Sequence, residues 1–505
     1  MSAEASSRRH LLDGATRVFL GEALFFPTGL LVVAFLTRRL GPEGYGVLAL
    51  TMAPVLWIEW SVAALFSRAT VKLAGDAEDW RPVGAAIVRL HLAAGVLAGV
   101  LLAAFAGPVA ALLGEPALAG YLRLFALDVP LMTVIHAHRG LLVGTGGFRP
   151  RAVAAAARWI ARLLLIVALV EAGFSVTGAI LGNIGASLVE LAVVRSAIRP
   201  PLLGRAPLNV GPLWTYATPL FVSAASLRLF DRLDLFVYKA LGASTELAGI
   251  YGAAQNLALA PRIFNVSLST LLLATLTQML RIGQGRAAAD LSRDAERFGL
   301  ALLPLAGIAA GSAPELVGLV FGETYAPAAP LLALLLFATI ASVQMSIATA
   351  VLTAGGKPGW TVWLAWPLVP LAAAGHLLAI PRFGAAGAAF VTSACAALGA
   401  AACVLAVRRV WGVAPPLATL GRSALLTVCA YLAAAAWSSP GPWVLLKMGI
   451  LVAGVVAGFA ALGEVGLGRR PPAWRVLLPD SGLYGSVSGP RDDLDRAPQA
   501  RPARR

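Results

Sequence analysis

Long apolar segments alternate with short polar gaps along almost the whole chain. Each apolar segment has about 20 residues, which is the length that a helix needs to cross the hydrocarbon core of a bilayer. The pattern therefore predicts an all-α, polytopic membrane protein. About fourteen such segments can be placed, over residues 14–38, 46–66, 84–106, 121–143, 152–171, 175–195, 212–238, 248–279, 298–321, 328–353, 361–380, 385–407, 418–437 and 442–467.

The first two segments are separated by Leu-Gly-Pro-Glu-Gly-Tyr-Gly at residues 40–46. Gly followed by Pro cannot continue a helix cheaply, so we expect a sharp corner here. A weak echo, LGASTELAGIYGAAQNLA, follows the seventh segment at residues 241–258. Repeats that lie half a chain apart, with six spans each, enter the membrane in the same orientation. They predict two six-helix bundles related by a pseudo-two-fold axis along the membrane normal.

This repeat divides the chain into four parts. We expect an N-terminal six-helix bundle, a C-terminal six-helix bundle, two additional transmembrane helices and a disordered, Pro- and Gly-rich cytoplasmic tail. Their predicted ranges are 1–205, 206–412, 413–470 and 471–505.

The composition agrees with a membrane protein and excludes a soluble one. Hydrophobic residues make up 59% of the chain, charged residues 13%, and the mean hydropathy is +0.80. The net charge of +15 would suggest nucleic acid in a soluble protein. Here the cations, among them Arg151 and Arg158, collect in alternate gaps and at the ends of the neighbouring spans, as expected for cytoplasmic loops. Topology thus explains most of the charge, no nucleic-acid partner is expected, and both termini are predicted to be cytoplasmic. The three cysteines lie in apolar runs without metal-ligand spacing and are interpreted as packing residues.

Charged residues inside predicted spans are the candidate functional residues, because each costs about 2.5–3.5 kcal/mol at mid-bilayer. The seventh span holds Arg228, Asp231, Arg232 and Asp234. At 100° per residue the four occupy an arc of about 160°, so one helix face can turn all of them toward a cavity. An alternative is internal neutralisation, with Arg228 paired to Asp231 and Arg232 to a carboxylate on another helix, in a purely structural role.

Three further residues complete the set. Arg262 has no acidic neighbour in its own span, and a guanidinium grips phosphate oxygens bidentately without losing its charge. Glu22 and Glu59 lie in the first two spans, where each could pair with an arginine or take up a proton or a sodium ion. We expect no catalytic constellation, no metal site and no cofactor.

Several stretches resemble the polysaccharide flippases of the multidrug/oligosaccharidyl-lipid/polysaccharide (MOP) exporter superfamily. They are the corner at residues 40–46 and the segments 139–149, 321–326, 354–357 and 381–389, in the family's order and spacing. The resemblance implies a non-enzymatic flippase of the bacterial inner membrane. Its substrate would be a polyprenyl-(pyro)phosphate-linked oligosaccharide or polysaccharide precursor, moved by alternating access, with membrane lipids as its surroundings.

Two other functions remain as alternatives at this point. One is a small-molecule antiporter of the same superfamily. The other is a membrane-embedded glycan polymerase or ligase, against which the short outer loops argue. Because the corner at residues 40–46 falls on the predicted outer side, we expect it to shape the fold and to lie apart from the substrate site.

Overall fold

The computed structural model describes residue 18 and residues 20–464, apart from 202–210, 260–261, 414 and 416. The helices belong to one compact unit, Met1–Val465. The predicted tail and the first residues of the predicted first span lie outside the described residues. In the first half of the chain the helices are α2 (Phe25–Asp76), α3 (Trp80–Leu112), α4 (Leu118–Phe125), α5 (Asp128–Gly144), α6 (Phe148–Leu169), the π-helical turn Val170–Phe174 and α7 (Ser175–Ala197).

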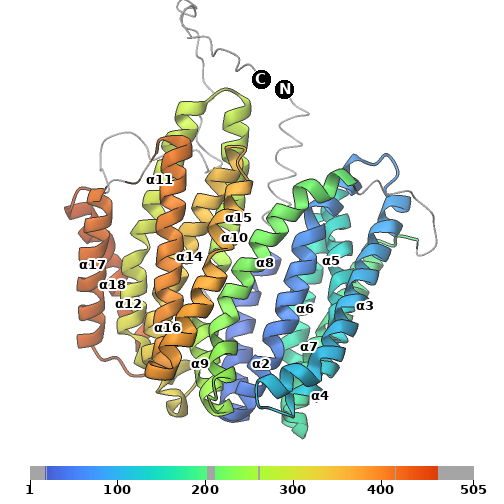
Figure 1. Ribbon diagram of the computed structural model, residues 1–505, viewed down its shortest axis with the longest axis horizontal. Coiled ribbons are helices and arrows are strands. Elements are labelled where there is room, and N and C mark those ends of the chain that lie inside the picture. The colour runs from blue at the N-terminus through green and yellow to red at the C-terminus, as the bar shows by residue number, and fades with distance from the viewer. Residues whose placement is uncertain are drawn as a thin grey trace, which may run out of the picture. The chain divides into compact units, whose positions relative to one another are not determined.

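The second half continues in the same way (Figure 1). Its helices are α8 (Gly211–Ala240), α9 (Thr245–Leu259), α10 (Arg262–Arg281), α11 (Gly285–Ala301), α12 (Leu303–Gly311), α13 (Ala313–Val320), the 3-10 turn η2 (Glu323–Tyr325), α14 (Ala328–Ala354), α15 (Gly359–Ala365), α16 (Leu368–Trp411), α17 (Leu417–Ala436) and α18 (Trp443–Ala461). The prediction of an all-α polytopic membrane protein is confirmed.

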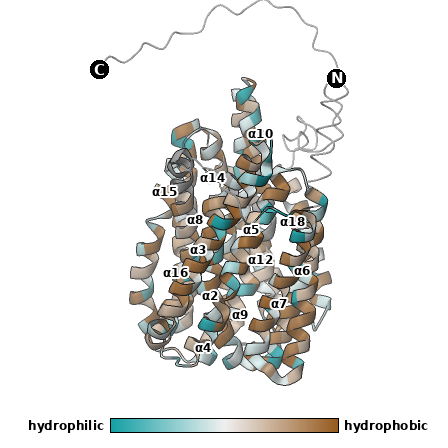
Figure 2. Ribbon diagram, turned by 90° about the vertical axis from the view of Figure 1, so that its right-hand side faces the viewer, coloured by the Kyte–Doolittle hydropathy of each residue, from teal (hydrophilic) through white to brown (hydrophobic). Residues whose placement is uncertain are grey.

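Eight helical stretches in the described part of the chain are long and apolar enough to cross a membrane. The bent pair formed by Gly285–Gly311 and Ala313–Val320 would make a ninth. Hydrophobic residues run along the middle of the helices, and hydrophilic residues are more frequent near their ends (Figure 2). The number of fourteen spans stays a prediction, as do the domain boundaries and the pseudo-two-fold axis.

Three of the eight stretches are too long for one crossing, with 47, 50 and 53 residues. At 1.5 Å per residue, 50 residues extend about 75 Å, whereas the hydrocarbon core is about 30 Å thick. Each contains a glycine with positive φ where the helix direction changes: Gly41, Gly173 and Gly384. Gly41 has φ 67° and ψ 178°, a conformation that side-chain-bearing residues avoid. The corner predicted from the Gly-Pro sequence therefore lies at Gly41.

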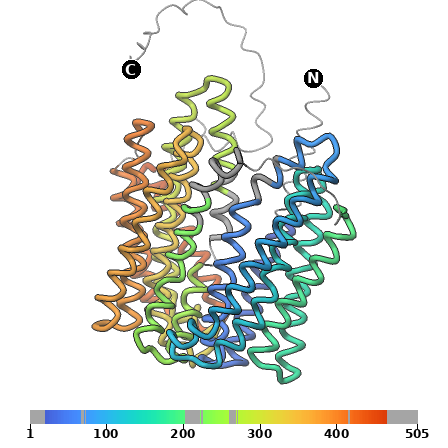
Figure 3. The backbone as a smooth tube through the Cα atoms, turned by 45° about the vertical axis from the view of Figure 1, so that its right-hand side comes forward, coloured from blue at the N-terminus to red at the C-terminus, as the bar shows by residue number. Residues whose placement is uncertain are grey.

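The first and second halves of the chain lie side by side (Figure 3). Most of the contact between them is made by α2, which packs against α8 and α9. It is closest next to the Gly41 corner, where a Cβ atom at Gly249 would lie 1.9 Å from the carbonyl oxygen of Pro42. A Cβ at Gly46 would lie 2.1 Å from the carbonyl oxygen of Thr245. We call the end of the helices that holds this contact the hinge face.

Gly249→Ala should lower the free energy of unfolding by about 1–3 kcal/mol, because the new methyl group forces α2 and α9 apart. Gly454→Ala is the matched control, since a Cβ there meets no atom within 4 Å in helix α18. Thermal unfolding of the purified protein in detergent checks both variants. Equal unfolding temperatures for the two would contradict the close contact.

The opposite end of the helices is tied together by Glu464, just after α18. Its carboxylate accepts hydrogen bonds from Arg297 of α11, at 2.7 Å, and from Thr419 and Arg422 of α17. Partial burial raises the pKa of Glu464, but these hydrogen bonds outweigh burial and leave the pKa below its ordinary value. The ionised carboxylate thus links α11, α17 and the end of α18.

Because the pKa of Glu464 is depressed in the folded state, its stabilising effect is present above the ordinary glutamate pKa of about 4.3 and lost as the pH falls below that value. Glu464→Gln should therefore unfold at a lower temperature than the wild type at pH 7. The difference should shrink toward pH 4. A difference independent of pH would show that the charge on Glu464 does not matter.

Candidate functional site

The charged residues of α8 turn toward neighbouring helices. The guanidinium of Arg228 lies 4.6 Å from the centre of the Trp60 ring of α2. One of its nitrogens lies 4.0 Å from Asp231, and 37% of the Arg228 side chain is exposed. Arg228 is thus placed between the two halves of the chain, stacked on an aromatic ring and still accessible.

Arg232 and Asp234 lie deeper and are held by α9. Arg232 donates hydrogen bonds to Gln255 at 2.5 Å and to Asn256 at 2.7 Å. Asn256 in turn donates to the Tyr45 hydroxyl of α2 at 2.7 Å. Arg232 therefore belongs to a polar chain that joins α8, α9 and α2.

Asp234 is buried and accepts several hydrogen bonds. Its donors are the Tyr251 hydroxyl at 2.6 Å, the Gln255 amide at 2.7 Å, the Thr392 hydroxyl at 2.9 Å and the backbone N–H of Leu235 at 2.8 Å. These donors satisfy the carboxylate and fix α8 against α9 and α16. This geometry gives Asp234 a positioning role.

Three predicted residues remain. Arg262 begins α10, and its side chain lies outside the described residues. Glu22 forms an ion pair with Arg151 of α6, so one of its two predicted roles, pairing with an arginine, is present. Glu59 is buried, and its Oε1 has no hydrogen-bond partner among the described residues.

A second charged group lies in the first half of the chain, and its ion pairs were not predicted from the sequence. Arg139 of α5 binds Glu190 of α7 through two hydrogen bonds, at 2.6 and 2.7 Å. Arg158 of α6 lies 3.6 Å from the same carboxylate, and Asn183 of α7 donates to Asp128 at 2.7 Å. The group links α5, α6 and α7 across the interior.

The arginines of α6 share one face of that helix. Arg158 and Arg162 lie 5.5 and 6.0 Å from the centre of the Trp159 ring. The spacing of Arg151, Arg158 and Arg162 confines them to an arc of about 40°. That spacing was the signal in the sequence, but Arg151 and Arg158 were interpreted as loop cations near a predicted span end.

The arrangement suits binding of an anion better than catalysis or metal coordination. No group of three or more His, Cys, Asp or Glu residues that could hold a metal ion occurs in the described part of the chain. The interior contains guanidinium groups on α6 and α8, and most of them bind carboxylates or amides. Arg228 combines a position between the halves with an accessible side chain.

A model of the polysaccharide biosynthesis protein family matches residues 35–330. This chain belongs to that family. No curated protein matches it. Its membership agrees with the resemblance found in the sequence and links the protein to polysaccharide biosynthesis.

Solved structures show that this family member has the MOP superfamily fold. An inward-facing multidrug resistance MATE family transporter matches 77% of this chain and 94% of its own, with a TM-score of 0.66 and 14% identity. The lipid II flippase MurJ, in an inward closed conformation, matches 90% and 99%, with a TM-score of 0.66 and 13% identity. A MOP superfamily transporter from Pyrococcus furiosus matches 87% and 96%, with a TM-score of 0.57 and 13% identity.

Arg139→Gln should destabilise the protein by about 3–5 kcal/mol, because it leaves the Glu190 carboxylate buried with a weakened set of partners. The double variant Arg139→Gln, Glu190→Gln should recover part of the loss. Arg293→Gln is the control, since its ion pair with Asp290 is exposed. If unfolding temperatures of Arg139→Gln and Arg293→Gln agree, the buried pair is energetically unimportant.

Proposed function

We propose that this protein is a flippase that moves a polyprenyl-(pyro)phosphate-linked oligosaccharide or polysaccharide precursor across the bacterial inner membrane by alternating access. Membership in the polysaccharide biosynthesis protein family supports the glycan, and the MOP fold supports transport. In this proposal both termini are cytoplasmic and the hinge face is the outer end of the helices.

The observation that carries the proposal is the position of Arg228. A lipid-linked glycan brings a phosphate or pyrophosphate that must be stabilised within the low-dielectric part of the membrane. Arg228 lies between the halves of the chain, with its guanidinium beside the Trp60 ring and 37% of its side chain exposed. In this proposal Arg228 binds the phosphate oxygens bidentately, and Arg262 is a second anion-binding residue.

Buried carboxylates supply the groups for ion coupling. Glu22 is engaged by Arg151, whereas the Oε1 atom of Glu59 is buried without a hydrogen-bond partner among the described residues. A buried carboxylate oxygen without a hydrogen bond is costly in its charged form, which favours uptake of a proton. We therefore assign a proton-carrying role to Glu59 within this proposal.

The two alternative functions are less well supported. A small-molecule antiporter of the same superfamily agrees with the fold but not with membership in a polysaccharide biosynthesis family. A membrane-embedded glycan polymerase or ligase agrees with that family, but the structural neighbours are transporters. The assay described next separates the enzyme from the flippase.

Arg228→Ala should abolish export while the protein still inserts and folds, and Arg228→Lys should retain part of the activity because the charge remains. The assay is the accessibility of lipid-linked oligosaccharide from outside in cells depleted of the wild-type protein and supplied with each variant. Arg382→Ala is the control, because Arg382 is exposed at the Gly384 break of α16.

Normal export by Arg228→Ala would refute the anion-binding role. If the lipid-linked glycan accumulates on the outer leaflet but stays unpolymerised in depleted cells, the protein is a polymerase or ligase and the flippase proposal is wrong.

A further inference from the structure

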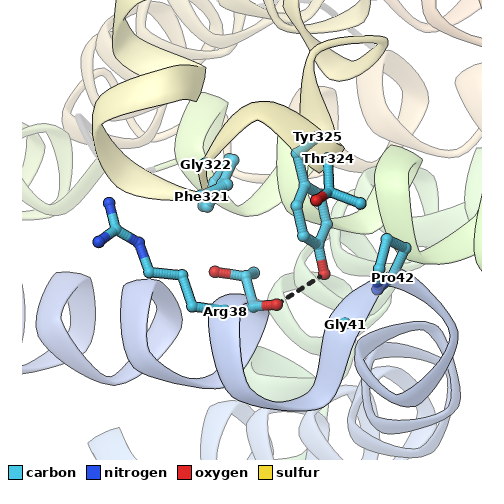
Figure 4. A pocket seen from close by; sticks show the side chains of 8 residues that line it. Arg38, Gly41, Pro42, Phe321, Gly322, Thr324 and Tyr325 are labelled. Carbon is cyan, nitrogen blue, oxygen red and sulfur yellow. Dashed lines mark hydrogen bonds between the residues drawn. The ribbon is translucent and has the colours of Figure 1, made fainter.

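A cavity of about 420 Å³ opens at the hinge face, away from the charged interior. One wall is the end of the first part of α2 and the corner, with Thr37, Arg38, Gly41 and Pro42. The other wall comes from the turn between α13 and α14, with Phe321, Gly322, Thr324 and Tyr325. Residues far apart in the sequence thus face each other across the cavity (Figure 4).

The two walls are joined by contacts at their edges. Arg38 reaches across and donates a hydrogen bond to the carbonyl oxygen of Leu319 at 2.6 Å. The Tyr325 hydroxyl donates to the carbonyl oxygen of Thr37 at 3.4 Å, as the dashed line in Figure 4 shows. The Tyr325 ring packs edge-on against Tyr45 of α2, with ring centres 6.4 Å apart. These contacts define the cavity in the state where the two walls are together.

The shape of the cavity is fixed by the backbone. Gly41 and Gly322 both have positive φ, of 67° and 91°, so larger residues would be strained at either position. A Cβ atom at either glycine would meet no atom within 4 Å. Open space therefore lies beside both glycines, and the buried Thr37, Phe321 and Tyr325 form firm walls around it.

The lining indicates the chemistry of a ligand. Arg38 is the one charged residue among the eight that line the cavity, and its side chain is exposed, as is that of Thr324. The Thr37 hydroxyl is buried against the carbonyl oxygen of Val33 at 2.8 Å, which leaves the exposed Thr324 hydroxyl as the polar group available to a ligand hydroxyl. A guanidinium with several donors suits a carboxylate, and a threonine hydroxyl suits a sugar hydroxyl. The volume falls within the usual range for small-molecule sites.

We propose that this cavity binds a sugar acid, a hexuronate-like unit of a glycan, whose carboxylate contacts Arg38 on one wall while a hydroxyl contacts Thr324 on the other. Because such a ligand touches both walls, it binds the state in which they are together and slows their separation. The effect on transport rests on the proposed function. If the protein is a flippase, glycan that has reached the hinge face would slow further transport.

Binding is tested on the purified full-length protein by titration calorimetry and thermal unfolding with sodium D-glucuronate, D-glucose and inorganic phosphate. D-glucuronate should bind saturably and raise the unfolding temperature, and D-glucose should bind at least about tenfold more weakly, because it lacks the charge-assisted contact. Arg38→Ala should lose at least about tenfold in glucuronate affinity. Thr324→Trp should block binding by filling the cavity.

Arg39→Ala is the matched control, because Arg39 adjoins Arg38 but pairs with Glu171 at 3.0 Å and does not line the cavity. Equal binding of D-glucose and D-glucuronate, or glucuronate binding that Arg38→Ala leaves intact, would overturn the proposal. Phosphate that binds as tightly as D-glucuronate would also overturn it, since the cavity would then be a simple anion site.

The transport step is tested separately, with D-glucuronate supplied on the hinge side in the leaflet-accessibility assay. Slower export in the wild type but not in Arg38→Ala is expected. If the wild-type protein binds D-glucuronate but exports no glycan, the cavity is a sugar-acid site and the proposed function is wrong. If it exports glycan but does not bind D-glucuronate, the sugar-acid site is refuted and the flippase proposal stands.

Discussion

Compensation of charge within a low-dielectric interior is the constraint on which the rest of this structure depends. The carboxylates of Glu190 and Asp234 are fully buried, and each is surrounded by donors from other helices. Removing either set of donors would leave a buried charge whose cost exceeds that of most single contacts. The charged groups therefore act as specific crosslinks between helices that are otherwise held by apolar packing.

The same constraint narrows the choice of functional residues. A guanidinium that saturates a buried carboxylate has few donors left for a substrate, and Arg139 is in this position. Arg228 differs in its position between the two halves of the chain, where 37% of its side chain is exposed. The candidate site is thus defined by where an arginine is both placed between the halves and accessible.

Much of the fold could be predicted from the sequence, because apolar length and Gly-Pro breaks are local signals. The corner at Gly41 and the placement of charges along α8 are examples. The partners of these charges could not be predicted, since they come from other helices: Tyr251 and Thr392 for Asp234, and Gln255 for Arg232. Arg158 was misjudged because a cation near a span end resembles a loop anchor, and only its Glu190 contact shows that it lies in the interior.

The weak repeat has a structural counterpart that sequence alone did not reveal. The close contacts join Pro42 with Gly249 and Gly46 with Thr245. Along the sequence, Thr245 follows Pro42 by as many residues as Gly249 follows Gly46, so the two contacts exchange equivalent positions of the halves. A two-fold relation between the halves would produce such a reciprocal contact, and the axis itself stays a prediction.

The glycine contact at the hinge face also has a mechanical consequence. The second part of α2 extends from Pro42 to Asp76, or about 51 Å at 1.5 Å per residue. A rotation of about 10° around the contact would therefore displace the far end of this helix by about 9 Å. The contact can act as a fulcrum, at which small angular changes become large movements at the opposite end, whereas opening the hinge face requires the fulcrum itself to part.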